Sequence, residues 1–208
     1  MLDDREISSD KYSDIVDLFN KKEFESLINK FQCLEEDKFE DPFLLNLLGA
    51  TYLKLDDKKN AKLYFSHAIA LEPNHREAII NLANLEYKAE SYQNAFDYYA
   101  KLTKNGTAEP NILGYMGKCL FELGHTEDGI TLCEEAISMD PNVEKPYFFL
   151  AEIMHKKEDP EAVVNYYYQV LERNPNSFSA YYELGNWFKK IKSFAKILLW
   201  VEKFKLGL

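Results

Sequence analysis

Residues 42–75 read PFLLNLLGATYLKLDDKKNAKLYFSHAIALEPNH, and this stretch decides the fold. Its apolar side chains Leu45, Leu48 and Tyr52 recur at helical spacing around the small residue Gly49. The same pattern returns every 34 residues, and the small residue at its centre becomes Ala83, Gly117, Ala151 and Gly185 in turn. A period of this length indicates a stacked array of repeats.

Each repeat is predicted to be a pair of helices. In units that begin at residues 42, 76, 110, 144 and 178, positions 4, 7, 8 and 11 share one face of a first helix. Positions 20, 24 and 27, which are Ala61, Phe65 and Ala68 in the first of these units, form the packing face of a second helix. The pair Asp41-Pro42 has the form of an N-cap followed by a first-turn proline. The expected unit is therefore an antiparallel helix pair.

This arrangement of small, aromatic and proline positions resembles the tetratricopeptide repeat. The matching residues of the unit at 42–75 are Leu45, Leu48, Gly49, Tyr52, Ala61, Phe65, Ala68 and Pro73. The units at 76–109, 110–143 and 144–177 match with substitutions, and the unit at 178–208 matches in its first helix. The resemblance implies an all-α, right-handed superhelical solenoid of antiparallel helix pairs, with about twelve helices.

The two ends of the array differ. Residues 1–7 are expected to be disordered or frayed, and residues 8–41 to form a degenerate N-terminal capping repeat, because Lys11 and Asp14 replace apolar residues of the repeat. The unit at 178–208 is predicted to be uncapped, since its last part keeps Leu198, Trp200 and Phe204. That apolar face is expected to pack on another molecule or on a continuation of the chain.

Composition excludes several classes of function. The net charge of −10 over 208 residues argues against nucleic-acid binding. No apolar run has membrane-spanning length, and the N-terminus lacks the apolar stretch of a signal peptide, so we expect a cytoplasmic protein with no membrane contact. Cys33, Cys119 and Cys133 are too irregular for a metal or disulfide site, and Cys119 and Cys133 are expected to be buried thiols. No catalytic, cofactor or metal motif is present, so the chain is predicted not to be an enzyme.

The resemblance also implies where a partner binds. In such arrays the first helices line a concave groove, and the family's contacts fall at positions 2, 5, 6, 9, 12 and 13. The predicted groove residues of this chain are Asn46, Asn81, Asn84, Tyr87, Tyr115, Lys118, Phe121, Phe148, Phe149, Glu152, Tyr182 and Asn186. Rings that bury apolar side chains and amides that pair with peptide groups suit an extended or helical peptide. Phe148 and Tyr182 are equally consistent with packing between adjacent first helices.

The leading hypothesis is a scaffold or adaptor that holds a protein or peptide partner in this groove. The cationic clamp that some co-chaperones use for carboxylate tails is missing, because only Asn81 fits its pattern. A looser resemblance to the N-terminal repeat arrays of bacterial glycosyl- and sulfotransferases suggests an alternative, a recruiting module of a larger transferase. Self-association through the basic and apolar C-terminal helix is a third possibility, since residues 189–208 carry six lysines and one acid, Glu202.

Overall fold

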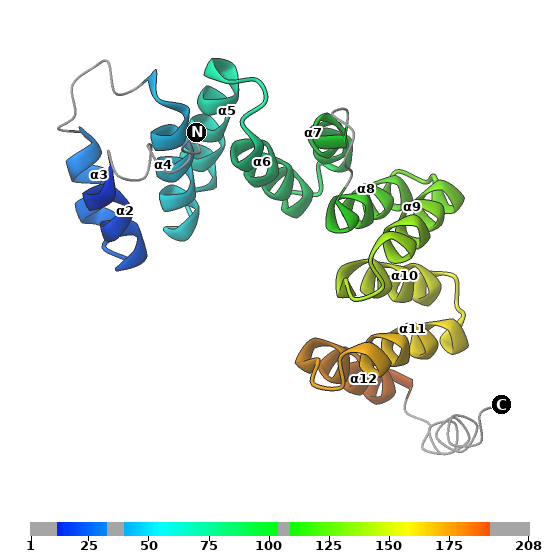
Figure 1. The fold of residues 1–208 in the computed structure, drawn as a ribbon. Coiled ribbons are helices and arrows are strands. Elements are labelled where there is room, and N and C mark those ends of the chain that lie inside the picture. The colour runs from blue at the N-terminus through cyan, green and yellow to red at the C-terminus, as the bar shows by residue number, and fades with distance from the viewer. Residues whose placement is uncertain (1–11, 33–39, 104–108, 192–208) are drawn as a thin grey trace. The chain divides into compact units, whose positions relative to one another are not determined.

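The structure is a computed structural model that describes residues 12–32, 40–103 and 109–191 (Figure 1). Within these ranges the regular structure is helical and contains no strand. The helices are α2 (Ser13–Asn20), α3 (Phe24–Gln32), α4 (Pro42–Lys54), α5 (Lys58–Leu71), α6 (Arg76–Lys88), α7 (Tyr92–Thr103), α8 (Pro110–Glu122), α9 (Thr126–Met139), α10 (Glu144–Lys156), α11 (Pro160–Arg173) and α12 (Phe178–Ile191). The all-α prediction is confirmed.

Consecutive helices form the predicted antiparallel pairs. The pairs are α2/α3, α4/α5, α6/α7, α8/α9 and α10/α11, and their connecting turns are residues 21–23, 55–57, 89–91, 123–125 and 157–159. The chain divides into two compact units, residues 1–108 and residues 109–208. We describe the two units separately, as the amino-terminal unit (α2–α7) and the carboxy-terminal unit (α8–α12).

The packing positions of the repeat are buried as the sequence predicts. At position 4 the exposed fraction is 1–4% in the first four units, whose residues there are Leu45, Ile79, Leu113 and Tyr147. Position 7 is buried in all five units, from Leu48 to Leu184. Each first helix thus buries one stripe against its neighbours, which is the main source of stability in a helix-pair array.

The small residue at position 8 permits close approach of the second helix. A Cβ atom at Gly49 would lie 2.6 Å from the ring of Phe65 on α5, and one at Gly117 would lie 2.6 Å from the carbonyl oxygen of Gly129 on α9. Both distances are shorter than a van der Waals contact, so glycine is required for this spacing of α4 against α5 and of α8 against α9.

Asp41 begins α4 as the sequence predicts. Its Oδ1 accepts hydrogen bonds from the backbone N–H groups of Phe43 at 3.0 Å and Leu44 at 3.4 Å. The other carboxylate oxygen accepts a 2.8 Å bond from the Tyr12 hydroxyl, next to α2. The cap therefore also ties the α2/α3 pair to α4, and Leu27 and Phe31 of α3 belong to the same core cluster as α4. That this pair acts as an end cap stays a prediction.

A backbone feature repeats with the same period as the side chains. Residues in the left-handed region, with φ from 59° to 94°, occur at Lys22, Asp56, Glu90, Gly124 and Glu158, each 34 apart. They follow the first helix of each pair, where a left-handed residue ends a helix and turns the chain. Only one of the five is glycine, the residue that adopts this conformation without strain.

Replacing Glu158 by glycine is expected to stabilise the carboxy-terminal unit. An L-residue in this conformation carries strain of about 1–2 kcal/mol, and the greater freedom of glycine in the unfolded chain offsets part of the gain. We expect Glu158→Gly to raise the free energy of unfolding by about 0.5–1 kcal/mol, measured by urea denaturation. The control, Glu135→Gly in the middle of α9, should lower it by about 1 kcal/mol. A loss of stability in Glu158→Gly would contradict this assignment of strain.

The last repeat departs from the pattern at its packing face. Tyr181 occupies position 4 but is 55% exposed, and a Cβ at Gly185 would have no neighbour within 4 Å. Phe178 is 80% exposed and stacks on Tyr182 with ring centroids 6.2 Å apart. In the preceding units a second helix covers this face, and the corresponding segment here, together with the expected C-terminal helix, lies outside the described residues. Residues 1–7 also lie outside them.

Candidate binding groove

The carboxy-terminal unit contains a cavity between α10, α11 and α12. Its volume is about 510 Å³, within the range of sites that hold small ligands or short peptide segments. The cavity is lined by Lys145, Phe148, Phe149, Glu152, His155, Lys156, Val163, Tyr167, Ser179, Glu183, Asn186, Trp187 and Lys190. We call it the α10–α12 pocket.

Aromatic side chains form the apolar part of this pocket. The ring of Phe148 lies 6.0 Å from that of Tyr167, and the ring of His155 lies edge-on to the indole of Trp187 at 4.6 Å. Phe149 is 8% exposed and contacts Tyr115 edge-to-face at 5.2 Å. Because the rings come from three helices, the pocket depends on the packing of α11 and α12 against α10.

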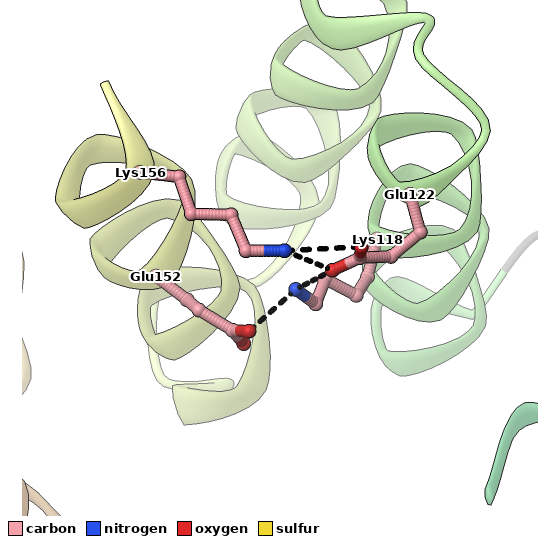
Figure 2. A network of polar contacts seen from close by, with 4 residues as sticks. All are labelled: Lys118, Glu122, Glu152 and Lys156. Atoms are coloured by element: carbon pink, nitrogen blue, oxygen red, sulfur yellow. Dashed lines mark hydrogen bonds and ion pairs between the residues drawn. The ribbon is translucent and has the colours of Figure 1, made fainter. Parts of the chain in front are cut away.

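A charged network joins α8 to α10 beside the pocket (Figure 2). The ammonium group of Lys118 lies 2.6 Å from a carboxylate oxygen of Glu122 and 2.7 Å from one of Glu152. Lys156 donates to both oxygens of Glu122, at 2.9 and 3.0 Å. The four residues occupy positions 9 and 13 of two consecutive units, so the repeat itself brings the four side chains together.

Burial makes Lys118 the critical member of this network. Its side chain is 3% exposed, whereas Glu122 is 17% and Lys156 49% exposed. A buried ammonium group is tolerated only when carboxylates neutralise it, and two carboxylates do so here. The ring of Phe121 lies 5.2 Å from the Lys118 ammonium and 4.9 Å from that of Lys156, which adds cation–π attraction.

The network changes the ionisation of Glu122. Burial raises the pKa of its carboxyl, but the hydrogen bonds from Lys118 and Lys156 and the charges of these lysines outweigh burial and hold the pKa below its ordinary value of 4.5. Burial also raises the pKa of the Tyr167 hydroxyl to about 12, and the nearby carboxylates of Glu183 and Glu152 contribute to that rise. Tyr167 is therefore a neutral phenol at physiological pH.

The stabilising effect of Glu122 is expected to disappear in acid. A carboxyl whose pKa is lower in the folded than in the unfolded state stabilises the fold above its ordinary pKa, and this contribution is lost as pH falls through the folded value. Wild type should thus exceed Glu122→Gln in unfolding free energy at pH 7, and the difference should vanish as pH falls below 4.5. Urea denaturation across this range measures it, with Glu135→Gln on α9 as the control. A pH-independent difference would refute the role of the charge.

The predicted groove residues of the amino-terminal unit contact side chains of neighbouring helices or of each other. Asn81 donates to the side-chain oxygen of Asn46 at 2.9 Å, which joins α6 to α4. The Tyr99 hydroxyl of α7 donates to the amide oxygen of Asn84 at 2.7 Å. Tyr87 meets Tyr92 edge-to-face at 5.9 Å. These amides are thus partly used in positioning neighbouring helices.

The predicted groove residues of the carboxy-terminal unit fall into three groups. The pocket brings together Phe148, Phe149, Glu152 and Asn186. Lys118 and Phe121 belong to the charged network, where Lys118 is held in ion pairs and is not a free cation, and Tyr115 supports Phe149. Tyr182 lies outside the pocket lining and is 57% exposed.

Sequence reasoning missed several residues of the pocket. Val163 and Tyr167 occupy positions 20 and 24, which serve packing in every unit, and Trp187 lies at position 10. Only the geometry shows that they also reach the cavity. Lys156 and Lys190 could have been identified, because both occupy position 13, one of the positions that the resemblance assigns to contacts.

Neither thiol chemistry nor a metal centre is indicated in the described part of the chain. Cys119 and Cys133 are fully buried as expected, and burial raises the pKa of each thiol to about 12, which suppresses the reactive thiolate. No group of three or more His, Cys, Asp or Glu residues in residues 12–32, 40–103 and 109–191 could hold a metal ion. Over the same ranges, no helix has the length and apolar character needed to cross a membrane.

Comparison with known proteins finds relatives that contain the same repeat. The family model for the tetratricopeptide repeat matches residues 44–75. The chain is 26% identical over 180 residues to the TPR repeat-containing protein YpiA of Bacillus subtilis (strain 168), which covers 83% of the chain. It spans 42% of the length of YpiA and 33% of the length of another curated relative, so it corresponds to part of each.

Solved structures agree with the helix-pair architecture. MamA (residues 41 to the end) from Desulfovibrio magneticus RS-1 matches with a TM-score of 0.71 and 19% identity, over 82% of this chain and 97% of that one. YrrB, described as a TPR protein with an unusual peptide-binding site, matches with a TM-score of 0.56 and 17% identity, over 81% and 87%. At these identities the likeness establishes the fold alone, that of a tetratricopeptide repeat solenoid. The family model and these structures together support a tetratricopeptide repeat protein.

Proposed function

We propose that this chain is an interaction scaffold that binds a peptide or a partner helix of another protein on its first helices. In the carboxy-terminal unit, the proposed binding site of the ligand is the α10–α12 pocket. The observation that carries the proposal is a cavity of about 510 Å³ lined at positions 2, 5, 6, 9, 12 and 13 of α10 and at positions 2, 6, 9 and 13 of α12. These are the contact positions that the repeat resemblance implies.

The chemistry of the lining supports a protein ligand. Aromatic rings supply apolar contact area, and the side chains of Asn186, Ser179 and Tyr167 can exchange hydrogen bonds with a peptide backbone. A central apolar surface with a polar rim is typical of protein-recognition sites. The peptide-binding site named for YrrB shows that the fold accommodates this kind of ligand in another protein.

Partner capture with pocket variants tests the proposal. Phe149→Ala is unsuitable because Phe149 is buried and packs on Tyr115, so its loss would also disturb folding. The combined substitution of His155 and Asn186 by alanine changes less buried side chains of the lining. We expect it to reduce capture of a specific partner from native lysate by about tenfold, with an unchanged circular dichroism spectrum.

The matched control is Met139→Ala, because Met139 is 51% exposed on α9 and does not line the pocket. This variant should capture the partner as wild type does. Equal capture by wild type, the control and the double pocket variant would refute the assignment of the binding site to the α10–α12 pocket.

A further inference from the structure

One hydrogen-bond donor of the α10–α12 pocket is buried without a partner. Trp187 lines the pocket, and its indole Nε1 has no hydrogen-bond partner within the described ranges. Buried indole N–H groups normally find an acceptor, since leaving such a donor unpaired costs free energy. An unpaired donor at a cavity wall indicates an acceptor that arrives with a ligand.

The imidazole of His155 lies against the indole of Trp187. Nε1 itself is buried, and the exposed imidazole of His155 lies edge-on to the indole at 4.6 Å. An exposed ring held by one aromatic contact can turn at small cost, because rotation of an exposed side chain breaks little packing. Movement of this ring would give a ligand in the pocket more room beside the indole.

The charges around the pocket disfavour a charged anchor of either sign. Glu152 from α10 and Glu183 from α12 both lie close enough to the Tyr167 hydroxyl to affect its ionisation. Lysines 145, 156 and 190 also line the cavity. A charged anchor of either sign meets charges of its own sign as well as of the opposite sign, and it gives up charge hydration on entering among the aromatic rings, whereas an uncharged side chain loses no charge hydration.

The aromatic walls of the pocket favour a large apolar side chain. Phe148, Tyr167 and Trp187 offer aromatic surface from all three helices of the pocket. Burial of a large apolar side chain against such rings is the dominant favourable contribution in anchor pockets. A main-chain carbonyl is a neutral acceptor, and every residue of a bound peptide carries one.

We propose that the α10–α12 pocket binds an extended peptide segment through a large uncharged apolar anchor side chain, seated among Phe148, Tyr167 and Trp187, with a main-chain carbonyl accepting the hydrogen bond of Trp187 Nε1. This inference rests on the proposed scaffold function and specifies the ligand of that site. Trp187 acts in it as a specificity-determining donor.

The indole N–H can be observed directly. The chain has two tryptophans, Trp187 and Trp200, so a ¹⁵N-labelled full chain shows two indole signals in a proton–nitrogen correlation spectrum, and the variant Trp200→Phe assigns them. The probes are four capped pentapeptides with two glycines on each side of a central phenylalanine, leucine, aspartate or lysine. Each probe is titrated into the wild-type chain.

The phenylalanine and leucine peptides should produce a saturable downfield shift of the Trp187 Nε1 proton, as a new hydrogen bond requires. The aspartate and lysine peptides should bind about tenfold more weakly, because each loses charge hydration and offers less apolar surface to the rings. Met139→Ala, on α9 outside the pocket lining, should leave the affinity for the phenylalanine peptide unchanged within about twofold. Trp187→Phe keeps a ring but removes the N–H, and should weaken binding of that peptide about fivefold.

Three outcomes would overturn the inference. They are an unshifted Trp187 signal with all four probes, equal or tighter binding of a charged probe, and unchanged affinity in Trp187→Phe. If partner capture still depends on His155 and Asn186 in any of these cases, the scaffold function stands and only the ligand assignment fails. If capture is independent of the pocket, the scaffold proposal fails as well.

Discussion

Replacement of Gly117 by alanine is expected to destabilise the carboxy-terminal unit by about 2–3 kcal/mol, although alanine is the better helix former. The added Cβ would lie 2.6 Å from the carbonyl oxygen of Gly129 and 2.8 Å from the Cys133 sulfur. Since the first of these contacts is with backbone, α8 and α9 have to move apart. Urea denaturation followed by circular dichroism measures the loss.

Ser138→Ala provides a control on α9. Ser138 is exposed, so this substitution gains helix propensity without a clash and should raise the unfolding free energy by about 0.5 kcal/mol. The two substitutions to alanine are thus expected to have opposite signs. Changes of the same sign and size would contradict the close approach of α8 and α9.

Replacement of Lys118 by methionine is expected to cost about 2 kcal/mol of unfolding free energy, because it leaves Glu122 and Glu152 without their buried cation while it keeps most of the side-chain volume. Lys156→Met is the control, since Lys156 is 49% exposed and its loss should cost only about 0.5 kcal/mol. Thermal or urea denaturation of both variants at pH 7 tests this difference.

A second substitution separates charge from packing. In the Lys118→Met background Glu122 still pairs with Lys156, whereas Glu152 has lost its pairing with Lys118. Glu152→Gln in that background therefore removes the uncompensated carboxylate and should recover part of the lost stability, as groups in one network are not additive. If Lys118→Met and Lys156→Met destabilise equally, or if Glu152→Gln lowers the stability of Lys118→Met further, the network does not stabilise α8 against α10 as we describe.

The repeat pattern predicts packing well where the structure describes both helices of a unit. Tyr147 and Tyr181 are the same residue type at the same position of their units, yet their exposed fractions are 1% and 55%. The periodicity determines which face a side chain occupies, but burial also depends on the element that covers that face. The prediction is therefore confirmed for the units at 42, 76, 110 and 144, and at Tyr181, where the covering segment lies outside the described residues, it stays a prediction.

The charged network could not be predicted from the sequence alone. Lys118 was expected to line the groove as a contact residue, and a lysine on a helix is normally solvated. Its burial between Glu122 and Glu152 depends on how α8 and α10 lie against each other. The periodicity along a single helix does not specify that packing. Tyr167 is a similar case. The sequence pattern predicts a core residue at its position 24 in every unit and does not predict that it lines the pocket.

Site-specific photo-crosslinking tests the central claim most directly. A photoreactive amino acid replaces His155, which lines the α10–α12 pocket, or Met139, which is exposed on α9 outside it. The full chain is then irradiated in native lysate. The scaffold account predicts a discrete crosslinked partner from position 155 and none from position 139. The same partner from both positions, or from position 139 alone, would contradict it.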